Sequence, residues 1–254
     1  MSKRNRKTPN RNRTPARAHP IAPVSLPPGI RVRHATAADL PAVRELTASA
    51  GCPLDDALVT AVKAGDVGSA LRAGAEGGGR DAFTYRMAEK LHGSPSPLAA
   101  ATAASLILVA ERSGSDGSSD IGEVIATLSA GPPGGVITNC LDQLPHLPPI
   151  ERGKLVMSGL IFVSKLYAIA TVPSARGQGI ASALIRYYRN VYTRCGYMVL
   201  YGEMDAGSGL EPFYRRNGFE IVPFGAALDL YVVFGHEIRV GAGPGERIFV
   251  RLER

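Results

Sequence analysis

The stretch that most constrains the fold is Val172–Leu184, where the end of an apolar strand runs into a turn with two glycines and then an amphipathic helix. Gly177 and Gly179 carry no Cβ, so the backbone N–H groups of this turn can approach a ligand closely. The helix that follows directs its positive dipole end and its unpaired N–H groups at the same point. Arg176 adds a full positive charge immediately before the turn. The sequence therefore predicts a site for a phosphate or pyrophosphate.

The length of 254 residues suffices for one large domain or two small ones with a sizeable core. The longest apolar run, residues 98–110, is shorter than the about 20 residues that span a bilayer. The basic N-terminus is followed by prolines rather than by an apolar leader. Three scattered cysteines (Cys52, Cys140 and Cys195) have neither metal-ligand nor disulfide-framework spacing. We therefore expect a cytoplasmic protein with no membrane segment and no metal.

The net charge of +7 is concentrated at the N-terminus. Residues 1–29 contain seven Lys and Arg and no acid, so the remaining 22 basic residues balance the 22 acidic ones. This segment is poor in large apolar residues, and we predict that it is a disordered basic arm. Such an arm could hold RNA or another acidic partner weakly, or it could be a solubilising extension without a partner. It contains no aromatic residue on which a base could stack.

Hydrophobic periodicity predicts alternating strands and helices after this arm. A strand at residues 29–35 leads into a helix from Leu40, which a capping box at Thr36–Asp39 would begin and Gly51 would end. We expect two helices with a flexible join in residues 52–97. Residues 131–153, which are rich in Gly and Pro, predict a long loop or lid with a short helix near residues 139–144.

The second half of the chain has a clearer pattern. Residues 165–172 are nearly continuously apolar, as expected of a central strand buried on both faces. The helix after the glycine turn should end at Gly196, and a short helix at about residues 209–216 should end at Asn217-Gly218. Further strands are expected at residues 105–111, 122–128, 198–201, 219–222, 228–234 and 247–252.

Spacing separates the ligand classes that use such a turn. The GxxxxGK[ST] loop of nucleoside triphosphate sites is absent. A dinucleotide fingerprint, GxGxxG, fits Gly177 and Gly179 but meets Ser182 at the third position, although Glu203 could serve as the ribose-binding acid. A dinucleotide-binding protein therefore stays open as a remote alternative.

Three motifs fit a third class. Residues 176–181, Arg-Gly-Gln-Gly-Ile-Ala, follow the pattern (Arg or Gln)-x-x-Gly-x-(Gly or Ala), and residues 213–219, Phe-Tyr-Arg-Arg-Asn-Gly-Phe, follow FYxxxGF. With an opening Arg33-x-Ala35-x-x-x-Asp39-Leu-Pro, these residues resemble the GNAT superfamily of acyl-CoA-dependent N-acyltransferases. The resemblance covers roughly residues 30–254 and is sharpest over residues 165–222.

The resemblance implies one α/β (α+β) domain over residues 30–254, with a mixed, largely antiparallel central sheet flanked by helices. In this family the strand before the turn and the next strand, here Leu166–Val172 and Met198–Glu203, splay apart and admit the pantetheine arm of acetyl-CoA. The pantetheine amides would bond the backbone of Ala170, Thr171 and Val172. The N–H groups that would hold the pyrophosphate belong to Arg176, Gly177, Gln178, Gly179, Ile180 and Ala181.

The resemblance also implies the chemistry, which is acetyl transfer to an amine by direct attack in a ternary complex, without a metal. Tyr214 aligns with the family tyrosine that donates a proton to the departing CoA thiolate. Some members carry a glutamate base on the strand before the turn, but this chain has none there. Glu203, Asp205 and a water chain are the alternatives, so the base stays open. Gly207 stands where the family often has an asparagine.

Two other functions remain open. The chain could be a non-catalytic acyl-CoA-binding regulatory or interaction module, which the missing strand glutamate and Gly207 favour. Alternatively, the arm at residues 1–29 could dock an enzyme on RNA or the ribosome, with a protein N-terminus or lysine as acceptor. The sequence leaves the acceptor open between a small amine and a protein amine, and it leaves the oligomeric state open, a homodimer included.

Overall fold

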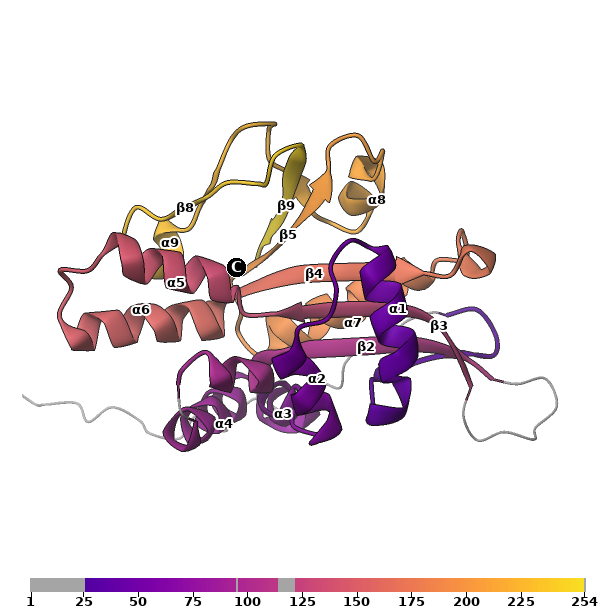
Figure 1. The fold of residues 1–254 in the computed structure, drawn as a ribbon, viewed down its shortest axis with the longest axis horizontal. Helices are drawn as coiled ribbons and strands as arrows, with labels where there is room; N and C mark the ends of the chain where they lie inside the picture. The colour runs from indigo at the N-terminus through magenta and orange to yellow at the C-terminus, as the bar shows by residue number, and fades with distance from the viewer. Residues whose placement is uncertain (1–25, 95, 114–121, 254) are drawn as a thin grey trace, which may run out of the picture.

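The computed structural model of the protein describes residues 26–94, 96–113 and 122–253. Within these residues the main sheet has seven strands in the order β1-β2-β3-β4-β5-β9-β6, and each neighbouring pair is antiparallel except β4 with β5. Helices cover both faces of the sheet (Figure 1), so the predicted mixed, largely antiparallel α/β fold is confirmed. The strands are β1 Ile30–His34, β2 Leu106–Arg112, β3 Glu123–Gly131, β4 Val163–Thr171, β5 Val199–Asp205, β6 Glu220–Ile221 and β9 Glu246–Leu252.

The predicted basic arm, residues 1–29, lies outside the described residues as far as residue 25. Residues 114–121, between β2 and β3, lie outside them too. The end of the arm is described and joins the sheet: the Ser113 N–H donates to the Gly29 carbonyl at 2.9 Å, and the Ile30 N–H donates to the Pro27 carbonyl at 3.2 Å.

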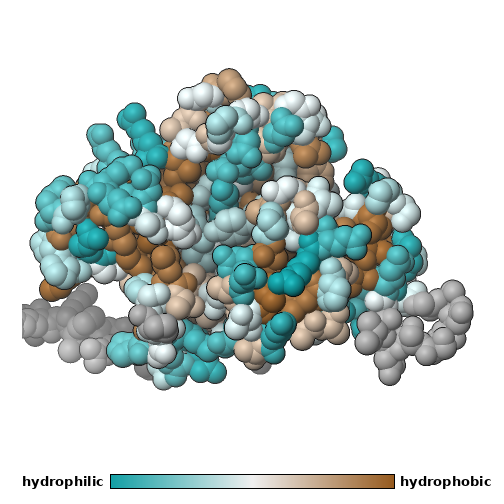
Figure 2. Space-filling model, in the orientation of Figure 1, coloured by the Kyte–Doolittle hydropathy of each residue, from teal (hydrophilic) through white to brown (hydrophobic). Residues whose placement is uncertain are grey.

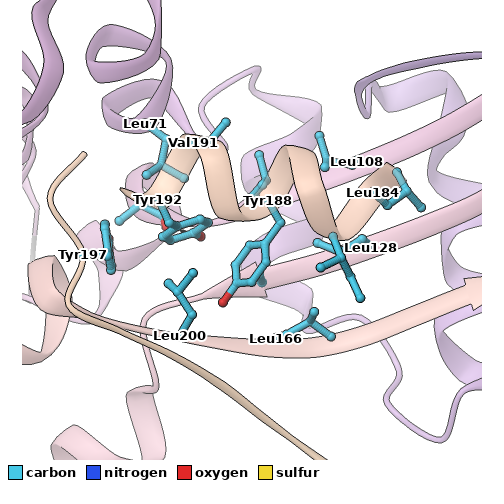
Figure 3. Packing of buried hydrophobic residues seen from close by; sticks show 14 of the residues in the cluster. Leu71, Leu108, Leu128, Leu166, Leu184, Tyr188, Val191, Tyr192, Tyr197 and Leu200 are labelled. Atoms are coloured by element: carbon cyan, nitrogen blue, oxygen red, sulfur yellow. Dashed lines mark hydrogen bonds between the residues drawn. The ribbon is translucent and has the colours of Figure 1, made fainter. Parts of the chain in front are cut away.

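Helix α7 (Ile180–Arg194) packs against one face of the sheet, which we call the dense face. Its apolar positions recur at helical spacing and are 0–1% exposed, as the sequence predicts: Ile180, Leu184, Tyr188 and Val191. Buried tyrosines fill the space beneath it (Figure 3). Their hydroxyls donate to nearby groups, Tyr188 to Ser164 Oγ at 3.3 Å, Tyr192 to the Ala104 carbonyl at 2.9 Å and Tyr197 to the Leu160 carbonyl at 2.8 Å.

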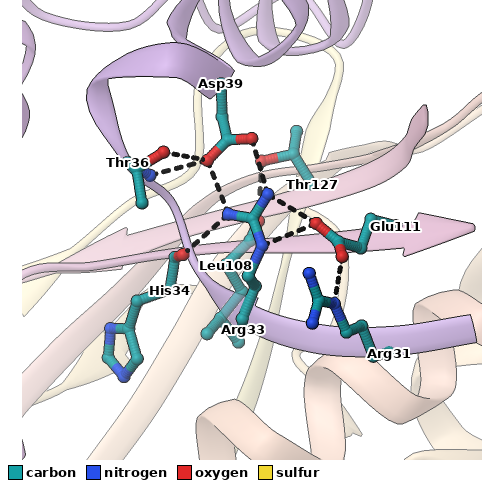
Figure 4. A network of polar contacts seen from close by, with 8 residues as sticks. All are labelled: Arg31, Arg33, His34, Thr36, Asp39, Leu108, Glu111 and Thr127. Carbon is teal, nitrogen blue, oxygen red and sulfur yellow. Dashed lines mark hydrogen bonds and ion pairs between the residues drawn. The ribbon is translucent and has the colours of Figure 1, made fainter. Parts of the chain in front are cut away.

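Helices α1 (Leu40–Ser49) and α2 (Asp56–Lys63) lie on the opposite face, which we call the open face (Figure 1). The predicted capping of α1 is confirmed, because the Thr36 N–H and hydroxyl both donate to Asp39 Oδ2, at 2.7 and 2.8 Å. Arg33 binds this carboxylate and that of Glu111 in a buried ion network (Figure 4). Burial opposes ionisation of Asp39, but hydrogen bonds from Arg33 and Thr36 outweigh it and lower its pKa. The network fixes the start of α1 against the sheet.

The segment between α1 and β2 contains more helix than the two helices predicted. After α2 come α3 (Ser69–Ala73), a π-helical turn at Gly74–Gly78, α4 (Gly79–Gly93) and a 3-10 segment at Ala99–Ala104. The predicted glycine break is the kink between α3 and α4, where Gly77 has a φ of 156°. Sequence periodicity missed α3 because five residues are too few to establish a helical repeat.

The expected long loop at residues 131–153 is wrong. The chain forms two helices between β3 and β4, α5 (Gly134–Gln143) and α6 (Pro149–Phe162), and they lie at one end of the sheet (Figure 1). Pro149 stands in the first turn of α6, where proline is compatible with a helix because its missing N–H would have no partner there. Proline content alone therefore misled the prediction.

The C-terminal part confirms the short helix α8 (Glu211–Arg216) and corrects the strand expected at residues 228–234. Leu228–Asp229 forms β7, which pairs with β8 (Arg239–Val240), but Tyr231–Phe234 forms the helical turn α9. The Asp229 carboxylate accepts the Tyr231 N–H at 2.8 Å and begins that turn. No helix among the described residues is long and apolar enough to cross a membrane.

Candidate functional site

The central strands β4 and β5 separate in the way that the resemblance implies. They pair from Val163 with Val199 to Leu166 with Gly202, yet β4 continues to Thr171 and β5 continues to Asp205. Gly202 stands where they part, and a Cβ there would lie 2.3 Å from Phe249 Cζ and 2.8 Å from the Leu166 carbonyl oxygen. The glycine therefore lets the Phe249 ring occupy the fork between the strands.

The glycine turn follows the free end of β4. Gly177 and Gly179 have φ values of 75° and 79°, which disfavour any residue with a Cβ. Nothing lies within 4 Å of where a Cβ would stand at either position, so the space in front of both is open. Gly179 immediately precedes α7, whose first N–H groups are aimed at this space. The predicted anion site thus corresponds to an open space in front of the N-terminus of α7.

A cavity of about 520 Å³ lies between this turn and α8, and we call it the glycine-turn cavity. Eight of the ten predicted site residues line it: Ala170, Thr171, Arg176, Gly177, Gly179, Ile180, Ala181 and Tyr214. Val172 and Gln178 do not. The Val172 N–H instead donates to the Ile125 carbonyl at 2.9 Å, and Gln178 Nε2 donates to the Ser174 carbonyl at 3.1 Å.

Tyr214 forms the far end of this cavity. Its ring stacks on Phe249 with 3.7 Å between centroids and 14° between planes, so the ring that occupies the strand fork also orients the tyrosine. The side chain is 4% exposed, and burial raises the pKa of Tyr214 to about 12. No residue that the structure describes forms a hydrogen bond with its hydroxyl. The group is therefore a protonated, uncommitted donor at neutral pH.

Two arginines line the glycine-turn cavity. Arg176 is exposed, and its Nε donates to the Thr171 carbonyl at 3.2 Å, while Arg216 lies at the end of α8. Neither forms an ion pair with any residue in the described ranges. Both guanidinium groups are available to an anion at the cavity wall.

A second cavity of about 440 Å³ lies where β4 and β5 diverge, and Tyr214 contributes to both. We call it the acidic cavity, because Glu203, Asp205 and Glu246 line it together with one cation, Lys165. Lys165 Nζ binds Glu203 Oε2 at 2.7 Å, and both side chains are about four-fifths buried. Asp205 is exposed, and its Oδ1 accepts the Gly207 N–H at 2.8 Å.

A third cavity of about 490 Å³ adjoins the acidic one, and the two share Cys52 and Tyr167. We call it the apolar cavity, because its other walls are mainly aliphatic residues at residues 53–58, in the 3-10 segment and at the start of α5. Figure 2 shows this side of the molecule hollowed between α5 and the α1–α2 region, with apolar surface on both sides. The cavities thus share wall residues: Tyr214 lines the glycine-turn and acidic cavities, and Cys52 and Tyr167 line the acidic and apolar ones.

The comparisons with known proteins now bear on this geometry. Residues 105–221 match the family described as the acetyltransferase (GNAT) domain. This segment is similar to a GNAT acetyltransferase domain. The matched segment runs from the start of β2 to β6 and includes the glycine turn and Tyr214. A search of curated proteins finds no match to the chain.

The solved structures that resemble this chain are distant in sequence. NAA60 from Arabidopsis thaliana, in complex with a bisubstrate analogue, is 16% identical over 89% of this chain and 99% of that chain, with a TM-score of 0.47. yncA from Salmonella typhimurium, with its cofactor acetyl-CoA, is 14% identical over 88% and 94%, with a TM-score of 0.44. PaiA N-acetyltransferase from Thermoplasma acidophilum, in complex with coenzyme A, is 10% identical over 88% and 99%, with a TM-score of 0.43.

Several residues at the cavities escaped the sequence analysis. Arg216, Leu210 and Phe213 come from α8, and Ser49 and Ala50 come from the end of α1. Arg216 could have been noticed as a cation two residues after Tyr214, on the same short helix. The sequence at the end of α1 contains no motif that predicts its position, so its place beside the diverging strands β4 and β5 could not be foreseen.

The structure does not bring together a metal site in the described part of the chain, where no group of three or more His, Cys, Asp or Glu side chains is placed to hold an ion. The cysteines do not meet either: Cys140 and Cys195 are buried in different clusters, and Cys52 stands between the acidic and apolar cavities.

Proposed function

We propose that this chain transfers an acetyl group from acetyl-CoA to a primary amine, and that the amine attacks the thioester directly in a ternary complex. One observation carries the proposal: a continuous space runs between the diverging strands from the open glycine turn to the uncommitted hydroxyl of Tyr214. The GNAT domain match supports the same reaction class.

The glycine turn suits the pyrophosphate of CoA. The N–H groups at the start of α7 and the open space before Gly177 and Gly179 allow close backbone contact with phosphate oxygens. Arg176 and Arg216 would add charge-assisted contacts to the CoA phosphates. A Cβ at either glycine would enter the space that the phosphates need.

The free edge of β4 suits the pantetheine arm. Backbone groups alternate in direction along a strand, and the Val172 N–H is bonded to β3, so those of Thr171 and Ile169 point toward the gap that β5 has left. We assign the pantetheine amides to Thr171 and Ile169. The backbone groups of Ala170 and Val172, which the resemblance also implicated, point toward β3 instead and would form no hydrogen bond with the pantetheine arm.

Acetyl-CoA supplies a thioester whose carbonyl carbon the amine attacks and whose sulfur departs as a thiolate. Tyr214 donates its phenolic proton to that sulfur as the carbon–sulfur bond breaks. Its raised pKa keeps the proton on the phenol until the thiolate forms, and Phe249 holds the ring in place. The nitrogen, which forms the new bond to carbon, loses two protons in all: one restores the Tyr214 phenol after the bond forms, and the second, which the bound ammonium loses before it attacks, needs a base.

We assign that second proton to Glu203. Its Oε2 accepts from Lys165, whereas its Oε1 forms no hydrogen bond with the described residues. Asp205 is a weaker choice, because its carboxylate is exposed and bonded to the Gly207 N–H. Lys165 thus holds the Glu203 carboxylate in place at the wall of the acidic cavity, where the acceptor amine would lie.

The cofactor part of the proposal is tested by measuring acetyl-CoA binding to the full chain, by calorimetry and by the thermal stabilisation that acetyl-CoA causes. Gly179→Val forces a β-branched residue into the left-handed region and fills the cradle, and Arg176→Glu reverses a charge. We expect each to weaken binding by at least about 100-fold, equivalent to about 2.7 kcal/mol.

Gly225→Val is the matched control, because Gly225 has a φ of 75° and no neighbour within 4 Å of its Cβ position but does not line the glycine-turn cavity. This variant should keep full binding. Unchanged stabilisation by acetyl-CoA in both site variants would overturn the assignment.

The catalytic part is tested by CoA release and by a mass shift on a mixed panel of small amines and peptides. Turnover of any amine supports the proposal. Tight acetyl-CoA binding with no turnover on any of them would favour the non-catalytic acyl-CoA-binding module instead.

A further inference from the structure

The apolar cavity offers a ligand almost no polar group. The Tyr167 hydroxyl donates to the Pro132 carbonyl at 2.7 Å, and Ser105 Oγ donates to the Ala101 carbonyl at 3.0 Å. The Asp55 carboxylate accepts the Ala57 N–H at 2.6 Å. Ser129, which is 3% exposed, keeps a hydroxyl without a partner among the described residues. The cavity therefore offers mainly apolar surface, with the second Asp55 carboxylate oxygen and the Ser129 hydroxyl as its free polar atoms.

The walls of this cavity come largely from parts of the chain outside the matched GNAT segment. Residues 52–58 and 98–102 precede the match, whereas Gly134 and Gly135 belong to α5, within it. The volume of about 490 Å³ falls within the range of about 300–1,000 Å³ that holds small ligands. Any preference of this cavity for a bulky apolar group therefore depends mainly on segments outside the family match.

The acidic cavity lies between this apolar space and Tyr214. Glu203, Asp205 and Glu246 against Lys165 give its wall a formal charge that attracts an ammonium group. An amine held there would have Tyr214 in one wall and Cys52 and Tyr167, which the acidic cavity shares with the apolar cavity, in another. An apolar group joined to the amine on the side of Cys52 and Tyr167 would extend toward the apolar cavity.

We infer that the acceptor is a primary amine that carries a bulky apolar group, aryl or branched alkyl. Its ammonium lies among the acids of the acidic cavity, and its apolar group fills the apolar cavity. This inference rests on the proposed acetyl transfer and specifies its substrate class. A small arylalkylamine and a peptide with an apolar first residue share this chemistry.

The first test compares acceptors with the full chain and saturating acetyl-CoA. Phenethylamine should have a kcat/KM about 10- to 100-fold above that of ethanolamine, which is the gain expected from burying an aromatic group. A peptide that begins with Phe is compared with one that begins with Ser. If only the peptide pair shows the preference, the source is a protein N-terminus, and if only the amine pair does, it is a small amine.

The second test narrows the apolar cavity. Ala57 lines it from the exposed first turn of α2, so Ala57→Phe should obstruct the space without disturbing the core. Ala64→Phe is the matched control, an exposed alanine at the other end of the same helix that lines none of the three cavities. We expect the phenethylamine preference to fall about tenfold in A57F and to persist in A64F.

A binding measurement separates this inference from the proposed function. Calorimetry in the presence of CoA should detect phenethylamine, with weaker binding in A57F than in A64F. Equal use of ethanolamine and phenethylamine, or an unchanged preference in A57F, would overturn the inference while acetyl transfer stands. If phenethylamine binds in this pattern but no amine is acetylated, the proposed function fails and the apolar site remains.

Discussion

The two faces of the central sheet are filled in different ways. On the dense face α7 covers a continuous core, in which Tyr188, Tyr192 and Tyr197 are at most 2% exposed and their hydroxyls are bonded. On the open face a smaller apolar cluster surrounds Val43 and Ile107, and the apolar cavity borders it at Leu54 and Leu58. The glycine-turn and acidic cavities lie where β4 and β5 part, and the start of α7 lines the first of them. One face is therefore closely packed, whereas the other borders an open cavity.

This difference separates two roles for the same residue types. Tyr188, Tyr192 and Tyr197 are core side chains whose hydroxyls are bonded, whereas Tyr214, in the same buried cluster, has no hydrogen-bond partner for its hydroxyl among the described residues. Charged groups differ as well. On the open face Arg33 is paired with Asp39 and Glu111, while His34, on the same strand, contacts Tyr187 of α7.

The largest expected effect is the loss of stability when a buried side chain of the dense face is truncated. Tyr192→Ala should lower the free energy of unfolding by about 3–5 kcal/mol, because it leaves a closed void and an unbonded Ala104 carbonyl. Leu54→Ala, at the apolar cavity, should cost only about 1 kcal/mol, because the space is already open. Urea denaturation of both variants measures the difference, and equal losses would contradict the distinction between the faces.

The next effect is on turnover. Tyr214→Phe should lower kcat by about 100-fold or more, with little change in unfolding free energy or in acetyl-CoA binding, because only the proton donor is lost. Tyr192→Phe is the matched control and should cost about 1 kcal/mol of stability while kcat is kept. Steady-state kinetics alongside denaturation checks both, and a Tyr214→Phe variant with unchanged kcat would remove Tyr214 from the mechanism.

The smallest effect is a pH dependence from the dense face. Burial first, and the charge of Arg72 second, lower the pKa of His34 from 6.5 to about 4. Between these values the unfolded chain binds a proton that the folded chain does not, so stability falls as pH drops from 6.5 toward 4. The loss at pH 5 relative to neutral pH should be about 2 kcal/mol.

The matched variant His34→Gln removes this titration. Unfolding free energies at pH 7 and pH 5 should differ less in H34Q than in the natural chain by that amount. An identical pH dependence in the two proteins would show that His34 is protonated without cost in the fold.

Much of the site could be predicted because its signals are local. The left-handed turn needs Gly177 and Gly179, the periodicity of α7 follows directly, and Tyr214 falls at a fixed place on a short helix. The capping of α1 by Thr36 and Asp39 is local too. Each of these depends on residues that are neighbours in sequence.

The other predictions failed where contacts between segments distant in sequence determine the local structure. Proline-rich residues 131–153 form helices because packing between α5 and α6 stabilises them, and α3 is held by α4. The composition of Tyr231–Phe234 predicts a strand, but the segment forms a helical turn, because the Asp229 carboxylate accepts the Tyr231 N–H at its start. The contribution of Arg216 to the cavity wall depends on where α8 lies.

The sequence by itself determined the glycine turn, the helix behind it and the tyrosine that follows, because backbone conformation and helical repeat are set by adjacent residues. Only the tertiary structure decided that β4 and β5 part at Gly202, that Phe249 enters the fork and stacks on Tyr214, and that the acidic and apolar cavities adjoin. These features join residues far apart along the chain, and their positions follow from packing, which no local pattern records.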